Sequence, residues 1–422
     1  MIVEQHELPL ADFVLVVKSG GETDESGKLG TATLATSLLK EGTTSRNSLQ
    51  IADHEAFLGV DIFTDSGWDA TTLQLHTPTA QLDSALALFA DVALRPAFPA
   101  NELERLRKNR LTSLLQVRDR GPEMANRAYA AIVFGPAVYG RPLNGDEAST
   151  EAVQQSDVRR FYDTYFRPNN ATLLVVGDVK PDDIERRVRA LFGGWERRAV
   201  PAATYGQPTP AKATTIYVVD KPGAAQSSFR IGTVGVTRNT PDYFPLTVMN
   251  TVLGGSFTSR LNQSLRETKA YTYGASSGFS MRRAPGPFIA SSEVVAAKTD
   301  SALIEFMKEL RAIRDTVPRD ELKKTKRYLQ LQLPGSFETT GGIAGQLAQL
   351  VRYDVPLSFY NGYIAGVAGV TQADVQRVAR QYIDPDKLSI VIVGDRKSIE
   401  PALKATKIGD VVVVDITGRP AM

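Results

Sequence analysis

Three hydroxyl side chains share one face of a predicted helix near the start of the chain. The segment GTATLATSLLKEGTTSR, residues 30–46, has the pattern of a helix that ends in a Gly-Thr-Thr-Ser turn. Thr33, Thr36 and Ser37 lie on one side of it, because residues three and four apart stack along a helix. This face is too polar for a core stripe and too short for a charged surface, which indicates a task other than packing.

Other groups that could hold a metal are few. The chain contains no cysteine, which excludes a disulfide scaffold, an iron–sulfur site and a thiolate zinc site. None of the three histidines, His6, His54 and His76, has a second histidine three or four residues away. We interpret them as surface or edge residues rather than as zinc ligands.

Charge and hydropathy exclude two further classes of protein. The 49 lysines and arginines nearly balance the 47 aspartates and glutamates, which argues against a dedicated binder of nucleic acid or of anionic membranes. No apolar run reaches the ~18 residues of a membrane-spanning helix. No signal peptide is recognisable, although a start so close to a predicted strand also fits the removal of a leader.

The chain contains the same order of elements twice. Four segments of the first half recur in the second half, in the same order and at nearly constant spacing. The pairs are KEGTTSR and GGSFTSR, LDSALALF and TDSALIEF, FPANELERLRKNRL and VPRDELKKTKRYLQ, and SDVRRFYDTYFRPNNATLLVVGD and ADVQRVARQYIDPDKLSIVIVGD. A duplicated domain explains this better than a coincidence of amphipathic helices.

Each half predicts a strand, a helix, two alternating strands, several helices and a final buried strand. We therefore expect the α+β class, with two homologous α/β-layer domains. In each, a mostly antiparallel sheet is covered by helices on one face. The boundaries are residues 1–200 for the first domain, a Pro- and Ala-rich linker at 201–215, and residues 216–422 for the second domain.

These motifs resemble the M16 family of zinc peptidases, the group of pitrilysin, insulin-degrading enzyme and mitochondrial processing peptidase. The resemblance rests on the order of elements, which occurs twice. A strand is followed by SGGETDESGKLG, a helix, the turn KEGTTSR, two strands and then PANELERLRKNRL. It covers essentially the whole chain. The length with two repeats is similar to the M16B subfamily, whose chains pair as dimers, so the resemblance implies one half of a clamshell.

The resemblance also explains the hydroxyl face. Active M16 chains carry H-x-x-E-H on this helix, in which two histidines bind Zn²⁺ and the glutamate activates a water. Here the three positions are Thr33, Thr36 and Ser37, and the family's further glutamate ligand matches Ser113 or Leu114. Hydroxyls are weak Zn²⁺ ligands. We expect a degenerate zinc site, no metal in this chain, and zinc in a partner subunit.

The second half keeps a motif that M16 peptidases direct at the substrate. In GGSFTSRLNQSLRETKAYTYGASS, Arg266 and Tyr273 have the family's seven-residue spacing, which implies catalytic roles. A phenol O–H can stabilise the oxyanion of peptide hydrolysis, and a guanidinium can bind peptide carbonyls. The alternative is that Arg266 pairs with Glu267 and that Tyr273 fills a sheet face. Tyr271, on the same strand face, competes for a substrate-binding role.

Two glycine clusters admit more than one interpretation. Gly254 and Gly255 could cap the preceding helix by supplying positive φ, or they could form a glycine-rich, substrate-binding loop. The second cluster, Glu338–Leu350, has the composition of a hinge or a helix start and lacks the lysine of a phosphate-binding loop.

The leading hypothesis is a non-catalytic subunit of a heterodimeric M16B zinc metallopeptidase, which is inactive alone and acts on peptides or unfolded polypeptides. Its partner would carry an intact H-x-x-E-H. The alternatives are a catalytically inert scaffold, similar to core subunits of respiratory complexes, and a peptide-binding homodimer. We favour a periplasmic location over a cytoplasmic one. The substrate and the cleavage specificity are not encoded in any motif.

Overall fold

Strand β2 (Leu10–Val17) is buried along almost its whole length in the computed structural model, which describes residues 1–421. A strand that is apolar on both faces needs cover on both sides of its sheet. The same holds for β10 (Ser389–Gly394) in the second half, whose six residues are all buried. Each of these strands lies in the interior of one sheet, and the two sheets belong to two compact units.

The first sheet has the strand order β1-β5-β2-β4-β3. Its β1–β5 pair is parallel, and the other three pairs are antiparallel, so the expectation of a mostly antiparallel sheet is confirmed. The remaining strands of this sheet are β1 (Ile2–Glu4), β3 (Asp61–Ser66), β4 (Thr71–Pro78) and β5 (Ala171–Gly177).

Helices cover both faces of the first sheet. The larger core lies on the face that carries Phe13 and Leu15, and a smaller core forms around Val14 and Val16 on the opposite face. The helices of this unit are α1 (Thr31–Leu38), α2 (Ser48–Leu58), α3 (Leu82–Leu94), α4 (Ala100–Val117, which ends in the second unit), α6 (Glu147–Ala152), α7 (Gln155–Tyr165), α8 (Pro181–Phe192) and α13 (Thr340–Arg352).

The second sheet has six strands in the order β11-β6-β10-β7-β9-β8, with β8 at one edge. Its other strands are β6 (Thr215–Asp220), β7 (Gln226–Val234), β8 (Thr272–Phe279), β9 (Pro287–Val295) and β11 (Asp410–Val414). The helices of this unit are α5 (Gly121–Phe134), α9 (Tyr243–Leu253), α10 (Arg260–Asn262), α11 (Thr299–Ala312), α12 (Arg319–Gln332), α14 (Tyr363–Gly369), α15 (Gln372–Tyr382) and α16 (Arg396–Ala405).

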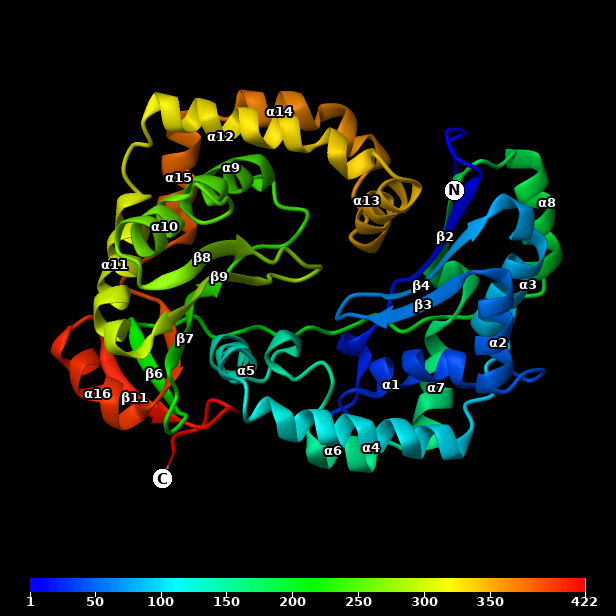
Figure 1. The fold of residues 1–422 in the computed structure, drawn as a ribbon, viewed down its shortest axis with the longest axis horizontal. Coiled ribbons are helices and arrows are strands. Elements are labelled where there is room, and N and C mark those ends of the chain that lie inside the picture. The colour runs from blue at the N-terminus through cyan, green and yellow to red at the C-terminus, as the bar shows by residue number, and fades with distance from the viewer. Residues whose placement is uncertain (422) are drawn as a thin grey trace. The chain divides into compact units, whose positions relative to one another are not determined.

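One helix of each repeat packs on the sheet of the other repeat. Helix α13 comes from the second half of the sequence but packs on β2 and β5, and it is orange beside blue β2 in Figure 1. Helix α5 comes from the first half and packs on β7 and β10. The expectation of helices on only one face of each sheet is therefore wrong, because a central strand that is buried on both faces needs cover on both sides of its sheet.

The segment between the repeats has little regular structure. Residues 201–214 contain neither helix nor strand, and β6 begins at Thr215. The backbone N–H of Val138 donates to the carbonyl of Tyr205 at 2.9 Å, which holds this segment near its start within the second unit. Across residues 1–421, no helix combines the length and the apolarity that crossing a membrane requires.

Candidate functional site

The hydroxyl face predicted from the sequence exists on helix α1, and its hydroxyls bond to the helix itself. Thr33 Oγ1 donates to the carbonyl of Gly30 at 3.0 Å, and Thr36 Oγ1 donates to the carbonyl of Ala32 at 2.8 Å. Ser37 Oγ donates to the carbonyl of Thr33 at 2.9 Å. Such bonds to the preceding turn satisfy hydroxyls inside a helix. Each hydroxyl proton is thereby engaged within α1.

A buried carboxylate fixes the beginning of this helix. Asp24 accepts hydrogen bonds from the N–H groups of Gly30 at 2.7 Å and of Ala32 at 2.9 Å. Burial raises the pKa of Asp24 to about 7, against the opposite effects of these hydrogen bonds and of Arg110. Arg110 donates to the carbonyl of Gly30 at 2.8 Å, and burial lowers the pKa of its guanidinium to about 10.

The other positions considered for a metal do not converge. Ser113 Oγ donates to the carbonyl of Asn109 at 3.0 Å, and Leu114 is buried. His6 contacts Asp178, and His76 contacts Asp12. Within residues 1–421, no group of three or more His, Cys, Asp or Glu side chains is placed to hold a metal ion. The donor set at α1, three hydroxyls bonded to backbone carbonyls, does not fit Zn²⁺.

The second unit brings three of the predicted residues to one open hollow of about 550 Å³. Gly254, Gly255 and Tyr273 all line it. The complete lining is Gly254, Gly255, Ser256, Phe257, Asn262, Tyr273, Gly274, Ala275, Ser276, Ser277 and Tyr328. Tyr271 lies outside this lining and is half-buried, with Lys298 Nζ 5.9 Å from its ring centre.

Arg266 does not line the hollow itself but packs against Phe257, which does. Its guanidinium lies 4.4 Å from the ring centre of Phe257, which lines the hollow. Its Nη1 is 3.0 Å from Glu267 Oε1, but it is buried and makes no hydrogen bond to any described residue. The pair with Glu267 exists as a contact of charges without hydrogen-bond alignment. Nη1 is therefore a buried donor without an aligned acceptor among the described residues.

Tyr273 does not fill a sheet face, because its side chain is 91% exposed. The register of β8 against β9 shifts between Thr272 and Ala275, at an irregularity that contains Tyr273. Such irregularities re-aim side chains and occur often beside active sites. The phenol therefore points away from the sheet core, which leaves its O–H available to a ligand.

The glycine pair owes its identity to close packing. Gly254 ends α9 with φ −157°, so the expectation of a positive-φ cap is wrong for this residue. A Cβ at Gly254 would lie 2.3 Å from the backbone nitrogen of Ser277 on β8, and one at Gly255 would lie 2.8 Å from Asn250 Nδ2. Gly254 lets the loop after α9 approach β8, and Gly255 lets it pack against the end of α9.

Two asparagines fasten this loop to the strand. Asn250 Nδ2 donates to the carbonyl of Ser277 at 3.0 Å, and Ser277 Oγ donates to Asn250 Oδ1 at 2.8 Å. Asn262 Nδ2 donates to the carbonyl of Phe257 at 2.6 Å and accepts from the N–H of Ala275 at 3.1 Å. The rim of the hollow is thus held by hydrogen bonds from both sides.

The link between Arg266 and Tyr273 has unusual backbone geometry. Arg266 lies in a π-helix, Gln263–Thr268, a form that occurs often at functional sites. Ala270, between the π-helix and β8, has φ 53°, which costs about 1–3 kcal/mol for a residue with a Cβ. The sequence showed only the seven-residue spacing.

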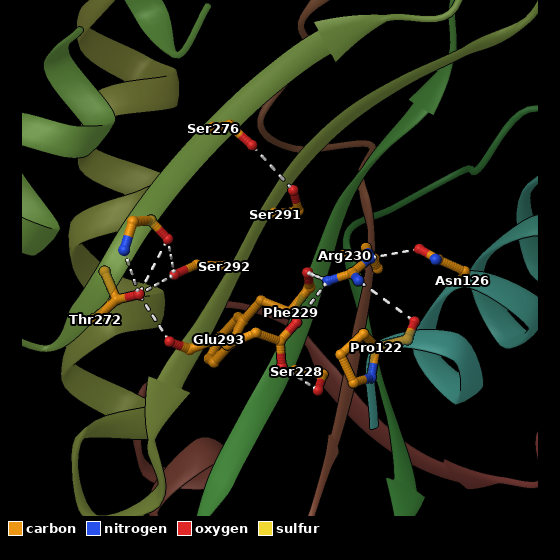
Figure 2. A network of polar contacts seen from close by, with 11 residues as sticks. Pro122, Asn126, Ser228, Phe229, Arg230, Thr272, Ser276, Ser291, Ser292 and Glu293 are labelled. Atoms are coloured by element: carbon orange, nitrogen blue, oxygen red, sulfur yellow. Dashed lines mark hydrogen bonds and ion pairs between the residues drawn. The ribbon is translucent and has the colours of Figure 1, made fainter. Parts of the chain in front are cut away.

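Figure 2 shows the polar network on the sheet beside β8. Ser276 on β8 contacts Ser291 on β9 at 3.3 Å. Farther across the sheet, Arg230 Nη1 lies 3.2 Å from Glu293 Oε1 and its Nε donates to Asn126 Oδ1 of α5 at 2.6 Å. Arg230 also donates to the carbonyl of Pro122, so this network anchors the exchanged helix to the sheet.

Comparison with known families finds two family models that match consecutive parts of the chain. Residues 1–147 match the family model described as insulinase (peptidase family M16). Residues 152–329 match the model described as the peptidase M16 inactive domain. The chain belongs to the M16 peptidase family.

Relatives and a solved structure extend the match of this M16 chain. A Mycobacterium leprae protein named an uncharacterized zinc protease is 27% identical over 60% of this chain, and the match spans only 57% of that protein. A Helicobacter pylori protein named a non-peptidase homolog is 21% identical over 93% of this chain and 91% of its own length. A crystal structure of a peptidase M16 inactive domain from Pseudomonas fluorescens is 26% identical, with a TM-score of 0.87, over 93% of this chain and 95% of its own.

Sequence reasoning missed several residues of the site in this M16 chain. Phe257, Asn262 and Tyr328 line the hollow, and Asp24 holds the beginning of α1. Phe257 and Asn262 lie inside the quoted second-half motif, so their proximity to Tyr273 could have been suspected. Tyr328 reaches the hollow from α12, and no local pattern pairs it with β8.

Proposed function

We propose that this M16 chain is the non-catalytic subunit of a heterodimeric zinc peptidase of the M16B type. The observation that carries the proposal is the contrast between its two halves. The hydroxyls of α1 are engaged by their own helix, whereas the Tyr273 phenol is exposed and Arg266 Nη1 has no hydrogen bond within the described chain. The partner would supply H-x-x-E-H and the metal.

The chemistry assigned to Tyr273 is oxyanion stabilisation. Attack on a peptide bond places negative charge on the carbonyl oxygen, and an O–H aimed at that oxygen stabilises it by about 3 kcal/mol. The exposed phenol needs no rearrangement of the sheet core to donate this hydrogen bond. The donor helps only if its strand holds it in place, which the asparagine contacts to β8 support.

The chemistry assigned to Arg266 is substrate positioning. Its guanidinium is always charged and presents several donors in a planar fork, which suits peptide carbonyls or a terminal carboxylate. Phe257 buttresses the plane at 4.4 Å, so the group loses little freedom when it binds. Loss of Arg266 should weaken substrate binding more than it slows the chemical step.

The decisive experiment mixes this chain with an M16 chain that carries an intact H-x-x-E-H, taken from the neighbouring gene where one exists. Cleavage of an unfolded polypeptide is measured for each chain alone and for the mixture, with zinc supplied. We expect cleavage only, or far faster, in the mixture. A mixture that forms a complex, retains zinc and cleaves no faster than the partner alone would overturn the proposal.

A second candidate is an inert peptide-binding or scaffold protein of the M16 fold. The Helicobacter pylori relative, named a non-peptidase homolog, favours it. The two candidates differ in what Arg266→Ala does. In the peptidase subunit it raises KM of the pair without removing zinc from the partner, whereas in an inert scaffold no cleavage depends on it.

A further inference from the structure

Strand β8 contains one extra residue at the point where Tyr273 lies. Thr272, at the start of β8, pairs with β9, and regular pairing resumes at Ala275. Between these two points Tyr273 and Gly274 oppose the single residue Glu293 of β9. This arrangement is a β-bulge, which interrupts the ladder and changes the direction of the side chains at that place. The exposed position of the Tyr273 phenol therefore depends on the bulge.

The corresponding pair of strands in the first repeat is regular. Strands β3 and β4 pair residue for residue from Asp61, opposite His76, to Ser66, opposite Thr71. Both β3 and β8 form an edge of their sheets, and they hold the same place in the duplicated order of elements. The fold of a repeat therefore does not require a bulge here, which leaves the bulge in β8 to be explained by a task of the second repeat.

Two hydroxyl side chains replace the ladder bonds that the bulge interrupts. The N–H of Gly274 donates to Thr272 Oγ1 at 3.1 Å, and Ser292 Oγ donates to the carbonyl of Gly274 at 2.9 Å. Thr272 Oγ1 donates in turn to the carbonyl of Glu293 on β9 at 2.7 Å (Figure 2). Each hydroxyl uses its single proton once in this set, and both backbone groups of Gly274 are satisfied.

These hydroxyls are themselves fixed, and they lie outside the hollow. Ser292 is 5% exposed, and its Oγ is 2.8 Å from Thr272 Oγ1. On the other edge of β8, the N–H of Ala275 donates to Asn262 Oδ1 at 3.1 Å, so side chains hold the bulge from both sides. Neither Thr272 nor Ser292 lines the hollow, whereas Tyr273 does. An effect of the two hydroxyls on a ligand is therefore expected to pass through Tyr273.

We propose that Thr272 and Ser292 are positioning residues for Tyr273, because they hold the bulge that directs its phenol toward the substrate. The proposal rests on the proposed function, in which the phenol donates to the oxyanion of a peptide bond. An oxyanion donor is effective only when it is held in place before the reaction. A loosened bulge should leave peptide binding unchanged and lower the share of complexes in which the phenol is in place. The expected result is a lower kcat at unchanged KM.

The first test uses the full-length chain alone. Thr272→Val keeps the shape of the side chain and removes the acceptor of the Gly274 N–H. Amide hydrogen exchange, resolved to single residues by fragmentation mass spectrometry, should become at least about tenfold faster at Gly274 in this variant. Thr272→Ser retains the hydroxyl and should exchange like the unmodified chain. Unchanged exchange of Gly274 in Thr272→Val would overturn the proposal, whatever the activity of the pair.

The second test measures steady-state kinetics of the active pair. Thr272→Val and Ser292→Ala should each lower kcat about tenfold, with KM within about twofold and the zinc content of the partner unchanged. Thr272→Ser should keep kcat within about twofold. Ser291→Ala is the matched control, because Ser291 is the neighbour on β9 and contacts Ser276 at 3.3 Å, where the pairing with β8 is regular. A loss of kcat in Ser291→Ala as large as that in Ser292→Ala would overturn the proposal.

A third test asks whether Thr272 acts through the phenol. In a pair that already carries Tyr273→Phe, the addition of Thr272→Val should lower kcat by no more than about twofold, since no phenol O–H remains to be positioned. The same tenfold loss with and without the phenol would show that Thr272 acts on another part of the site, and the assignment to Tyr273 would be wrong.

The positioning role and the proposed function fail separately. If Gly274 exchanges faster in Thr272→Val but the unmodified pair never cleaves peptide, the two hydroxyls hold the bulge and the peptidase role falls. If the unmodified pair cleaves peptide and both Thr272→Val and Ser292→Ala keep its kcat, the peptidase role stands and the positioning role falls.

Discussion

Helix α1 in the first unit and the segment 254–277 in the second unit carry the two sets of polar residues that the sequence singled out, yet these polar groups are in opposite situations. On α1 every hydroxyl of the predicted face donates to a carbonyl one turn earlier. In the second unit the Tyr273 phenol is exposed, and Arg266 Nη1 makes no hydrogen bond with the described chain.

This difference shows which half has hydrogen-bond donors that are not engaged by the chain itself. A hydroxyl that donates to its own helix has no proton left to donate to a ligand. A donor that is left without a partner costs stability, about 1–3 kcal/mol when buried, and this cost is offset only when a ligand completes it. In the second unit the buried Arg266 Nη1 has its contact with Glu267 but no aligned hydrogen bond, and Ala270 has a positive φ. Four experiments can break or sharpen the comparison.

The largest expected effect concerns pH and Asp24 in the first unit. Burial raises the pKa of Asp24 to about 7, so between about pH 4 and 7 the folded chain holds a proton that the unfolded chain has lost. The free energy of unfolding should therefore fall as pH rises through this window, by at most about 4 kcal/mol from this group. Urea unfolding measured from pH 4 to 8 checks it.

Asp24→Asn isolates that contribution, because the amide does not titrate. The difference between the unmodified chain and this variant should change across the window and level off above it. Asp53→Asn, an exposed residue on α2, is the matched control and should keep the original profile. If Asp24→Asn also keeps the original pH profile of unfolding, Asp24 does not titrate in the folded chain between about pH 4 and 7.

The next effect concerns the phenol of the second unit. Tyr273→Phe removes the proposed oxyanion donor and should lower kcat of the active pair about 100-fold, with zinc content unchanged. Tyr271→Phe, whose ring lies outside the hollow, should cost less than about threefold. Steady-state kinetics on one peptide compare the two variants. A greater loss from Tyr271→Phe than from Tyr273→Phe would reverse their assignment.

A smaller effect tests the close approach of the loop to β8. Gly254→Ala places a Cβ 2.3 Å from the backbone nitrogen of Ser277, so the strand must shift at a cost of about 2 kcal/mol. Thermal and denaturant unfolding measure that cost. Gly278→Ala on the same strand has nothing within 4 Å of the added Cβ and serves as the control. Equal stability of both variants would mean that the loop is not packed against β8.

The smallest expected effect is at the hydroxyl face. The triple variant Thr33→Val, Thr36→Val, Ser37→Ala removes three hydroxyls whose protons bond only to backbone carbonyls of α1. The activity of the pair should stay within about twofold, and stability within about 1 kcal/mol. A tenfold loss of kcat/KM in the pair would mean that these hydroxyls take part in the reaction. The two units would then not differ in this respect.

The sequence predicted those parts of the fold that depend on local pattern and repetition. The duplicated motifs identified both repeats, and the alternation in β3, β4, β8 and β9 identified the strands. The exchange of α5 and α13 was not predictable in this way, because an amphipathic helix does not encode which sheet it will cover. The second glycine cluster proved to be a helix start, where Thr339 Oγ1 accepts from the N–H of Gly342 at 3.0 Å.

For the site, the second-half motif predicted residues that lie within it and missed residues that are distant in the sequence. Gly254, Gly255 and Tyr273 share the hollow as their common motif suggested. Tyr328 comes from α12, and its position depends on how that helix packs against α9. Asp24 was missed because an acid before a glycine is common, and only the structure shows both of its oxygens directed at amides of α1.

The exchange of helices also affects the order in which the parts of the first core are made during translation. The strands of the first sheet are all made once the ribosome has passed Gly177, but α13, which covers Val14 and Val16, begins only at Thr340. Until α13 has been translated, the apolar face that carries Val14 and Val16 has no covering helix. The first repeat therefore keeps an apolar face exposed during synthesis, and a gene cut between the repeats would yield two fragments that each lack the covering helix from the other repeat.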